Sequence, residues 1–470
     1  MTETNSIAAS IEDHALEVVP ASDRHGWLQI SWNTVGIVTT LIQLFIGALT
    51  AFVAGMPIAL LGGFIVMIIG ALLGWGVGHI AYKTGLSSTV MSRIYGFGKA
   101  GSMITAIIFG FMIIGFIALE NVLLYKGLLF YFGIADSIQM QILIYGLLTL
   151  SWILLTAFGF GLVTKVSSWL LVLFLAVLVY IMWGVVGSSS YSVVEVTTFT
   201  SQLPVEVLTK MQAATWGDKL AFCVNILIGS AGALALIDGD LGRYARRSKD
   251  VAIAAFLGNA FMDIGMLFSG GVVMYAGMSE LVAYYVSTGM TQEAAHKIAL
   301  ESPDSVAAAF IVFGGILGAI LMLLAQAKAQ VLNTYSASLS LTNLMDAALG
   351  WQPGRLTFVI LANVIAILML LGSILDWFNS FLTILGILTT CISGIMIADY
   401  FIVHPRLNES QLNFNKKEAF NWSGILVGAI GFILAHYVLN SIIKIEFFTA
   451  LLFSVIAYPP LRLMSLSKHK

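Results

Sequence analysis

The sequence predicts an all-α, polytopic membrane protein with 12 transmembrane helices. Of its 470 residues, 59% are hydrophobic and only 10% are charged, and the mean hydropathy is +0.95. A soluble domain needs a charged surface that this composition does not supply. Apolar segments of about 20 residues, the length that crosses a hydrocarbon core of about 30 Å, recur along the chain between polar connections.

The predicted spans fall into three groups. After a polar N-terminal tail at 1–27, five spans are expected at 28–53, 58–80, 101–132, 140–160 and 167–186. An outer connection at 187–218 leads to a second group of five, expected at 219–237, 251–276, 305–332, 356–371 and 373–397. The region 398–470 holds the last two spans, at 422–439 and 445–463, and a short tail.

Lysine and arginine gather in the connections on one side of the predicted membrane. The segments that share a side with both termini contain Lys83, Arg93, Lys99, Arg243, Arg246, Arg247, Lys249, Arg406, Lys416, Lys417, Arg462, Lys468 and Lys470. Those on the opposite side contain only Lys126, Lys210, Lys219, Lys297 and Lys444. Because cytoplasmic connections carry the excess of positive charge, the pattern predicts a multi-pass protein of the inner (plasma) membrane with both termini in the cytoplasm.

Several function classes are disfavoured by what the sequence lacks. The net charge is −2 and no basic face is interleaved with aromatic residues, so no nucleic-acid partner is expected. Cys223 and Cys391 lie in apolar segments without CxxC spacing, and no HExxH motif, Walker loop or Cys/His cluster occurs. Neither a metal site, a cofactor nor an enzyme is therefore expected. A channel is disfavoured because no filter-like segment or ring of acids is evident.

Two predicted spans contain small or polar residues at mid-depth. In the sixth span, Gly229-Ser-Ala-Gly232 predicts a break, because unwound backbone is tolerated in lipid only where it lines a cavity or is covered by protein. Close helix packing is the alternative interpretation of such small residues. In the eighth span, 326–333 places amides and a lysine where polar groups are rare and usually functional. With Gly36 and Gly47 in the first span, these features predict a secondary transporter made of inverted five-helix repeats, with its first and sixth helices broken.

Four motifs resemble those of the nucleobase:cation symporter family, which includes the purine/cytosine permeases and the hydantoin transporters. They occur in order at Asp13–Pro20 with Arg24 and Trp27, at Tyr82–Ser87, at Asp240–Arg246 and at Asn333–Leu339. The resemblance implies a leucine-transporter-type core of two five-helix repeats, at 28–186 and 219–397, plus two C-terminal helices. It also implies a symporter that imports a purine or pyrimidine nucleobase, such as cytosine, or a related nitrogen heterocycle by alternating access.

The resemblance further implies which residues bind the substrate. Phe116 matches an aromatic residue that stacks on the ring in this family, and Glu120, one turn later, matches a polar residue that hydrogen-bonds it. Asn333 matches the family's amide in the eighth span, and Gln330 and Gln43 are further candidates. Each of these amides could instead join two helices.

The broken sixth span is expected to contribute backbone groups. Unwound peptide units at Ser230, Ala231 and Gly232 would offer free N–H and C=O groups to the ligand. The family has a second stacking aromatic residue at the position of Ala231, so one side of the binding site lacks its aromatic ring in this chain. The resemblance therefore leaves room for a bulkier ligand than cytosine.

Lys328 is the second departure from the family pattern. Sodium-coupled relatives hold the ion with backbone carbonyls and a hydroxyl pair in the eighth span, where this chain has Ala327-Lys328-Ala329. An ammonium group offers three donors and no acceptor, so we predict that Lys328 takes the cation's place and that coupling is to protons and not to sodium. Lys328, Glu120 and the buried acid Asp263 are candidates for ion coupling, and a static ion pair that only locks helices is the alternative.

The same predicted architecture is also compatible with a second function. An amino-acid or other small-amine permease would need a counter-charge for its amine, and Glu120 could supply it.

Overall fold

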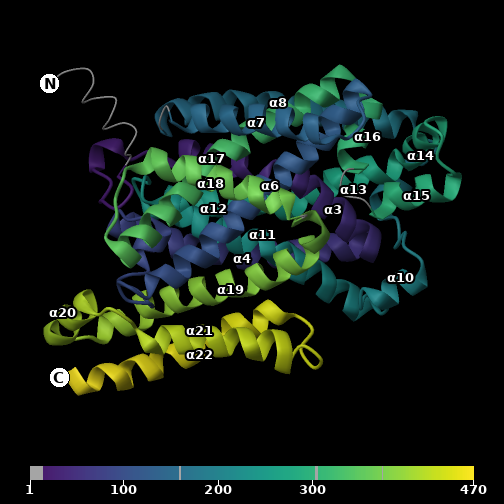
Figure 1. Cartoon of the computed structure of the whole chain (residues 1–470). Coiled ribbons are helices and arrows are strands. Elements are labelled where there is room, and N and C mark those ends of the chain that lie inside the picture. Colours follow the sequence, from purple (N-terminus) through teal and green to yellow (C-terminus); the bar gives the residue numbers. More distant parts are fainter. Residues whose placement is uncertain (1–13, 158–159, 302–304, 373, 470) are drawn as a thin grey trace, which may run out of the picture.

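The computed structural model describes residues 14–157, 160–301, 305–372 and 374–469. Within these ranges the chain is built from helices, and its one bridge between extended segments joins His25 to Ala245. The predicted all-α class is confirmed. Residues 1–13 of the predicted tail, including Asp13 of the first motif, and Lys470 lie outside the described residues. Both ends of the described chain lie at the same end of the helical bundle (Figure 1), which we call the terminal end.

The first group of spans begins with a bent pair. Helices α2 (Trp27–Val38) and α3 (Leu41–Ala54) meet at 64° and together form the first span. They are followed by α4 (Met56–Thr84), the short α5 (Ser88–Met91), α6 (Ser102–Phe132), α7 (Ile138–Ala157) and α8 (Phe160–Ser188). Two short helices, α9 (Val193–Thr198) and α10 (Val205–Lys210), fill the connection to the second group.

The second group begins with α11 (Trp216–Gly242). The seventh span runs from α12 (Ser248–Ala260) through a π-helical turn, η2 (Phe261–Met266), into α13 (Leu267–Ala276). Then follow α14 (Met278–Ser287), α15 (Gln292–Glu301), α16 (Ser305–Gly314), α17 (Ile316–Leu349), α18 (Arg355–Leu371), η3 (Ile374–Trp377) and α19 (Phe378–Ala398) with its π-helical extension η4 (Asp399–Val403). The C-terminal region contains α20 (Glu409–Lys417), α21 (Trp422–Ile433) with η6 (Leu434–Val438), and α22 (Glu446–Leu466).

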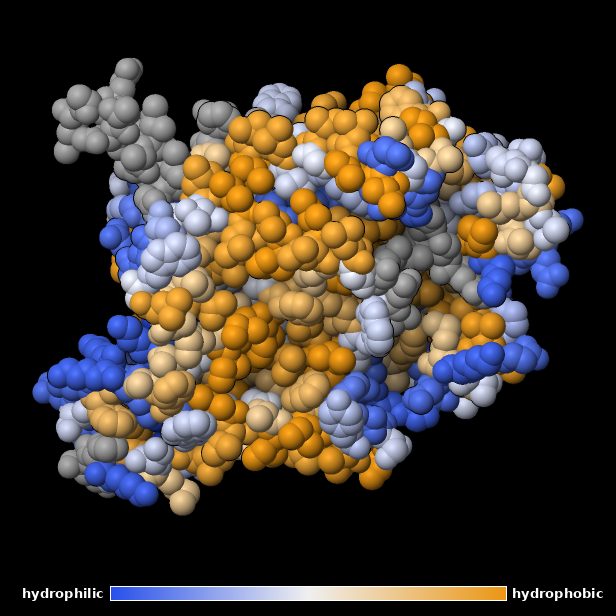
Figure 2. Space-filling model, in the orientation of Figure 1, coloured by the Kyte–Doolittle hydropathy of each residue, from blue (hydrophilic) through white to orange (hydrophobic). Residues whose placement is uncertain are grey.

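The helices are long and apolar enough for a polytopic membrane protein. Among the described residues, nine helices can cross a membrane, or up to 11 if each bent pair is one span. α18, an apolar helix of 17 residues, corresponds to the remaining predicted span. Apolar side chains form a broad band across the middle of the molecule, and hydrophilic side chains gather at its two ends (Figure 2).

The predicted boundaries of the eighth span are wrong. The chain turns at Gly315, whose φ is +51°, so 305–314 forms the separate helix α16 and the long helix α17 runs on to Leu349. Hydropathy does not indicate this turn, because the residues on both sides of it are apolar.

The predicted break in the sixth span is also wrong. α11 is continuous through Gly229 and Gly232, so the backbone groups of 229–232 are used inside the helix. The two glycines instead allow close contact with α19. A Cβ on Gly229 would lie 2.7 Å from the Leu382 carbonyl oxygen, and one on Gly232 would lie 2.5 Å from Thr389 Oγ1. The packing interpretation of these small residues therefore holds.

Gly229→Ala is expected to destabilise the protein. The added methyl group meets backbone atoms of α19, and overpacking of this kind costs about 1–3 kcal/mol. Gly146→Ala is the matched control, because a Cβ at that helical position meets nothing within 4 Å. Thermal unfolding in detergent should show a lower Tm for the first variant and an equal or higher Tm for the second. Equal Tm values for Gly229→Ala and the unmodified protein would contradict the packing role.

The predicted break in the first span is confirmed, between Val38 and Leu41. Thr40 caps α3 by accepting a hydrogen bond of 3.4 Å from the Gln43 backbone N–H. Side-chain capping of this kind competes with continuation of a helix. The break faces the centre of the bundle, because α2 packs on α12, α3 on α13, and both contact α11 and α17.

Candidate functional site

Five of the predicted site residues meet at one small cavity beside this break. Its lining includes Gln43 of α3, Phe116 and Glu120 of α6, Ser230 of α11, and Asn333 of α17. The cavity volume is about 30 Å³, which suffices for about one water molecule. Pockets that hold small organic ligands usually measure about 300–1,000 Å³, so a larger ligand can enter only if the surrounding helices move apart.

The polar groups of the cavity are joined in pairs across helices. The Asn333 amide donates a long hydrogen bond, 3.4 Å, to Glu120 Oε2, and the Thr40 side chain also hydrogen-bonds this carboxylate. The Gln43 amide donates to Ser230 Oγ at 3.1 Å. The Ser230 contribution thus comes from its side chain and not, as predicted, from unwound backbone. A carboxylate and two amides in one buried space can recognise both donors and acceptors on a ligand.

Phe116, an aromatic residue of the cavity lining, contacts one of two phenylalanines in the first turn of α19. Phe116 contacts the edge of Phe381 with ring centroids 6.0 Å apart, and Phe45 contacts Phe378 at 5.4 Å. Phe378 and Phe381 belong to the first turn of α19 and are not among the residues predicted from the sequence. Their spacing of three residues places them on one helical face, but the sequence does not show whether that face meets lipid or protein.

Lys328 lies in the interior and is 1% exposed. Its ammonium group donates to the Gly36 carbonyl oxygen at 3.0 Å, to Thr39 Oγ1 at 2.5 Å and to the Thr39 carbonyl oxygen. It also lies 4.5 Å from the ring centroid of Phe174 in α8. All three of these hydrogen bonds go to oxygen atoms of the first span where α2 ends, so Lys328 is held by the broken helix and not by a carboxylate.

The break thus carries a positive group on one side and a negative group on the other. The C-terminal end of α2 has a partial negative charge, which the Lys328 ammonium neutralises, and Glu120 lies beside Thr40 at the partially positive N-terminal end of α3. The two halves of the first span therefore bind opposite charges within one buried region.

Three of the predicted substrate-binding residues lie outside the cavity. Gln330 donates to the Ile117 carbonyl oxygen and to Asn121 Oδ1, both at 3.0 Å, and so joins α17 to α6. The Cβ of Ala231 lies against Gly70 of α4, and Gly232 packs on α19.

Asp263 occupies the π-helical turn η2 and is fully buried. Among the described residues, neither of its carboxylate oxygens has a hydrogen-bond partner. Its neighbour in the chain, Met262, lines the cavity, whereas Asp263 itself does not. A π-helical turn inside a helix often marks a functional position.

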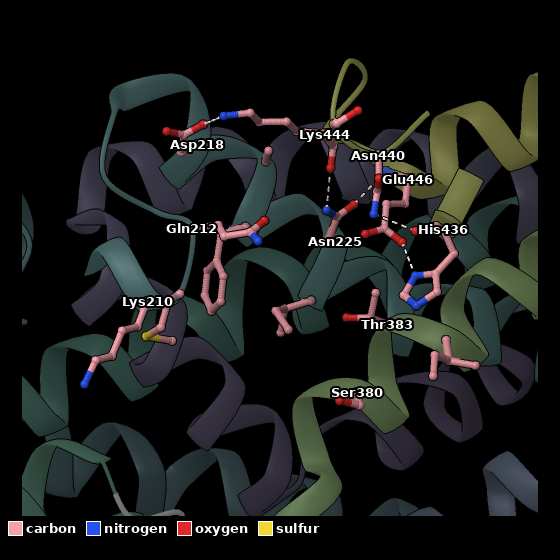
Figure 3. Close-up of a pocket in the computed structure, with 16 residues that line it drawn as sticks. Lys210, Gln212, Asp218, Asn225, Ser380, Thr383, His436, Asn440, Lys444 and Glu446 are labelled. Atoms are coloured by element: carbon pink, nitrogen blue, oxygen red, sulfur yellow. Dashed lines mark hydrogen bonds and ion pairs between the residues drawn. The ribbon is translucent and has the colours of Figure 1, made fainter. Parts of the chain in front are cut away.

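A larger pocket of about 630 Å³ lies elsewhere, between α10, the start of α11, the start of α19 and the connection from η6 to α22 (Figure 3). None of the predicted site residues lines it. His436 Nδ1 lies 2.6 Å from Glu446 Oε2, Lys444 pairs with Asp218, and Asn225 donates to the Lys444 carbonyl oxygen at 2.7 Å. These contacts attach the C-terminal hairpin to α11. We place the site at the smaller cavity, because the convergent buried polar groups and the helix break are there.

Comparison with known proteins gives one family, and three of the similar solved structures are described below. The family model for permeases for cytosine/purines, uracil, thiamine and allantoin matches residues 26–458. Mhp1, a nucleobase-cation-symport-1 family transporter, in a closed conformation with bromovinylhydantoin bound, has a TM-score of 0.72 at 17% identity and covers 98% of this chain and 95% of its own. The inward-facing conformation of Mhp1 gives 0.69 at 16% identity, with 96% and 95% coverage.

A Na⁺-coupled sialic acid symporter in a substrate-bound outward-open state has a TM-score of 0.63 at 12% identity and covers 98% of this chain and 93% of its own. No curated protein sequence matches the chain. At these identities the three structures establish the shared fold.

Proposed function

The chain belongs to the family of permeases for cytosine/purines, uracil, thiamine and allantoin, and from this premise we propose that it imports a nucleobase or a related planar nitrogen heterocycle together with protons. Its family and its Mhp1-like fold identify it as a multi-pass secondary transporter that works by alternating access, and not as an enzyme. The resemblance to nucleobase:cation symporters in the sequence is confirmed.

The observation that carries the substrate proposal is the convergence of Phe116, Glu120 and Asn333 on one buried cavity. An aromatic face can stack on a planar base, which is worth about 1–3 kcal/mol per base whatever the base is. A carboxylate and an amide can read the donors and acceptors on the ring edge. Phe116 and Glu120 are four residues apart on α6, so both side chains point the same way.

The coupling proposal depends on Lys328. The carbonyl oxygens of Gly36 and Thr39 at the end of a half-helix are the type of ligand that a sodium ion would need. An ammonium group already binds them, so we infer that this chain needs no sodium there. Protons then remain as the coupling ion, with Glu120, Lys328 and Asp263 as candidate titrating groups.

Uptake by proteoliposomes tests both parts of the proposal. Radiolabelled cytosine, uracil, allantoin and thiamine are offered with an inward proton gradient in sodium-free buffer, and again with a sodium gradient at uniform pH. We expect accumulation of at least one heterocycle with the proton gradient alone. Strict dependence on sodium would refute the coupling proposal, and accumulation of none of the four under either gradient would refute the substrate proposal.

A small-amine or amino-acid permease is the second candidate, and the buried Glu120 carboxylate is the observation that favours it. The same vesicles distinguish the two functions if radiolabelled amino acids and simple amines are added to the panel. Saturable uptake of an amine, unaffected by excess heterocycle, would favour this second function.

Phe116→Ala is expected to weaken heterocycle binding by about 5- to 150-fold, because it removes about 1–3 kcal/mol of stacking. Phe64→Ala is the control, since Phe64 is 54% exposed on the outer surface of the bundle. Competition of unlabelled heterocycle against labelled uptake gives the affinities. An affinity change of the same size in both variants would contradict a stacking role for Phe116.

We also propose that both termini lie in the cytoplasm and that the membrane is the inner (plasma) membrane. The support is the excess of lysine and arginine in the segments at the terminal end. Labelling of single cysteines introduced at 468 or 297 with a membrane-impermeant reagent on intact cells tests this. We expect labelling at 297 only.

A further inference from the structure

Two glycines of α4 make room for buried polar side chains from other helices. A Cβ on Gly74 would coincide with the Asp238 carboxylate, and one on Gly70 would coincide with the Asn259 amide oxygen. Asp238 belongs to α11 and Asn259 to α12. The two glycines are four residues apart, so the two polar groups face the same side of α4 at successive turns.

These polar groups lack partners on the sides that face α4. Asp238 and Asn259 are 1% and 0% exposed. Asp238 Oδ1 accepts a long hydrogen bond, 3.5 Å, from Thr34 Oγ1 of α2, and the Asn259 amide nitrogen donates to the Ala255 carbonyl oxygen at 2.8 Å. In the described part of the chain, Asp238 Oδ2 and Asn259 Oδ1 have no hydrogen-bond partner. Unpaired polar groups in a membrane span are costly and usually functional.

A proton on Asp238 would supply the donor that both groups lack. Asp238 Oδ2 and Asn259 Oδ1 are both acceptors, so neither can hydrogen-bond to the other while Asp238 is ionised. A protonated Asp238 is a donor, and Asn259 Oδ1 is an unpaired acceptor that faces the neighbouring turn of α4.

The position of Asp238 links it to the candidate site. Ile237, which precedes Asp238 in α11, lines the cavity. Its partner Thr34 belongs to α2, the half-helix whose C-terminal end binds Lys328. A change of protonation at Asp238 would therefore change how α2 is held against α11.

Other titratable groups lie on the elements packed around Asp238. They are His79, Tyr82 and Lys83 on α4, Asp218, Lys219, Cys223 and Asp240 on α11, Lys249 and Asp250 on α12, and Asp263 on η2, whereas α2 has none. Asp240 is only partly satisfied: its Oδ1 accepts from the Ser88 backbone N–H at 2.9 Å and from Ser88 Oγ at 2.7 Å, whereas its Oδ2 has no hydrogen-bond partner among the described residues. His79 Nδ1 lies 2.6 Å from Ser248 Oγ.

We propose that Asp238, with Asn259 and Thr34, forms a proton-binding site between α2, α4, α11 and α12, and that the proton bound there is coupled to substrate transport. This site is distinct from Lys328 and Glu120. The proposal rests on the proposed proton coupling and assigns it a residue. A buried acid that stays permanently neutral and only packs helices is the opposing view.

Asp238→Asn provides the main test, because it keeps the shape and removes the titratable group. In proteoliposomes, the heterocycle that the unmodified protein accumulates is measured in two ways: as accumulation driven by a proton gradient, and as counterflow without a gradient. We expect proton-driven accumulation to fall by about 5- to 150-fold, the usual size of a coupling between two ligands, with counterflow retained. A pH dye inside the vesicles should report that substrate-induced proton entry is lost.

Thr34→Val keeps the proposal testable if Asp238→Asn does not fold. It removes the hydroxyl that stabilises the ionised carboxylate, so half-maximal accumulation should move to a higher pH. Normal proton entry in Asp238→Asn, or an unchanged pH profile in Thr34→Val when Asp238→Asn is unfolded, overturns the assignment. Absence of proton entry in the unmodified protein is a different result: it refutes the proposed coupling itself, and this site with it.

Discussion

Lys328→Met is expected to reduce transport in sodium-free vesicles by about 10- to 100-fold. The substitution keeps an unbranched side chain of similar length and removes the charge. The Gly36 and Thr39 carbonyl oxygens then lose a charged donor, and hydrogen bonds to charged groups are worth about 1.5–3 kcal/mol each. Initial rates of heterocycle uptake with a proton gradient measure the effect.

Lys126→Met is the matched control. Lys126 also belongs to a long helix and also has a charged partner, since its ammonium lies 3.0 Å from Asp136 Oδ2, but both side chains are more than one-third exposed. The Tyr125 hydroxyl, which donates to Asp136, holds the pKa of this carboxyl down at about 2. An exposed pair of this kind contributes at most about 1 kcal/mol, so transport should change little.

The same variant separates two roles of Lys328. If the ammonium only locks helices together, Lys328→Met should lower the Tm, and added sodium should not restore transport. If it occupies the position of a coupling cation, the emptied carbonyl oxygens offer sodium a site, and sodium should restore part of the rate. Full activity of Lys328→Met in sodium-free buffer would contradict both roles.

The helices could be predicted because hydropathy reports burial in lipid directly, whereas the positions of breaks in helices could not. Gly229 and Gly232 suggested an unwound segment, but small residues serve close packing equally well, and the deciding atoms belong to α19, some 150 residues later. The real break, at Thr39 and Thr40, contains neither glycine nor proline. It is stabilised by a side-chain cap and by a lysine from α17, which are contacts between distant segments.

The charged residues of the candidate site could be predicted, because such residues are unusual inside a membrane span, whereas its phenylalanines from α19 could not. A carboxylate or lysine within a membrane span is expensive, so Glu120 and Lys328 stood out from their surroundings. The phenylalanines of α19 did not, because the sequence contains 29 phenylalanines and most need no explanation in a membrane. Gln330 also shows that an amide on the correct face can serve to join helices.

Glu120→Gln is expected to weaken heterocycle binding by about 10- to 100-fold. The ionised carboxylate is acceptor-only, and Asn333 already donates to one of its oxygens. Glutamine replaces one oxygen by an NH₂ group, so either Asn333 or the ligand then faces a donor where it needs an acceptor. Loss of a hydrogen bond to a charged group costs about 1.5–3 kcal/mol. Competition against labelled uptake measures the affinity, and Glu206→Gln, at an exposed position in α10, is the control.

The same substitution discriminates between the two candidate functions. For a neutral heterocycle, Glu120 accepts hydrogen bonds from donors on the ring. A ligand with one ring donor fewer makes one such hydrogen bond fewer, so Glu120→Gln should reduce the affinity for that ligand by a smaller factor. For a cationic amine, Glu120 supplies the only counter-charge among the side chains that line the described cavity, so every amine should lose affinity to a similar and larger extent. An affinity loss that follows the number of ring donors therefore supports a nucleobase-like substrate, and a uniform loss across amines supports an amine permease.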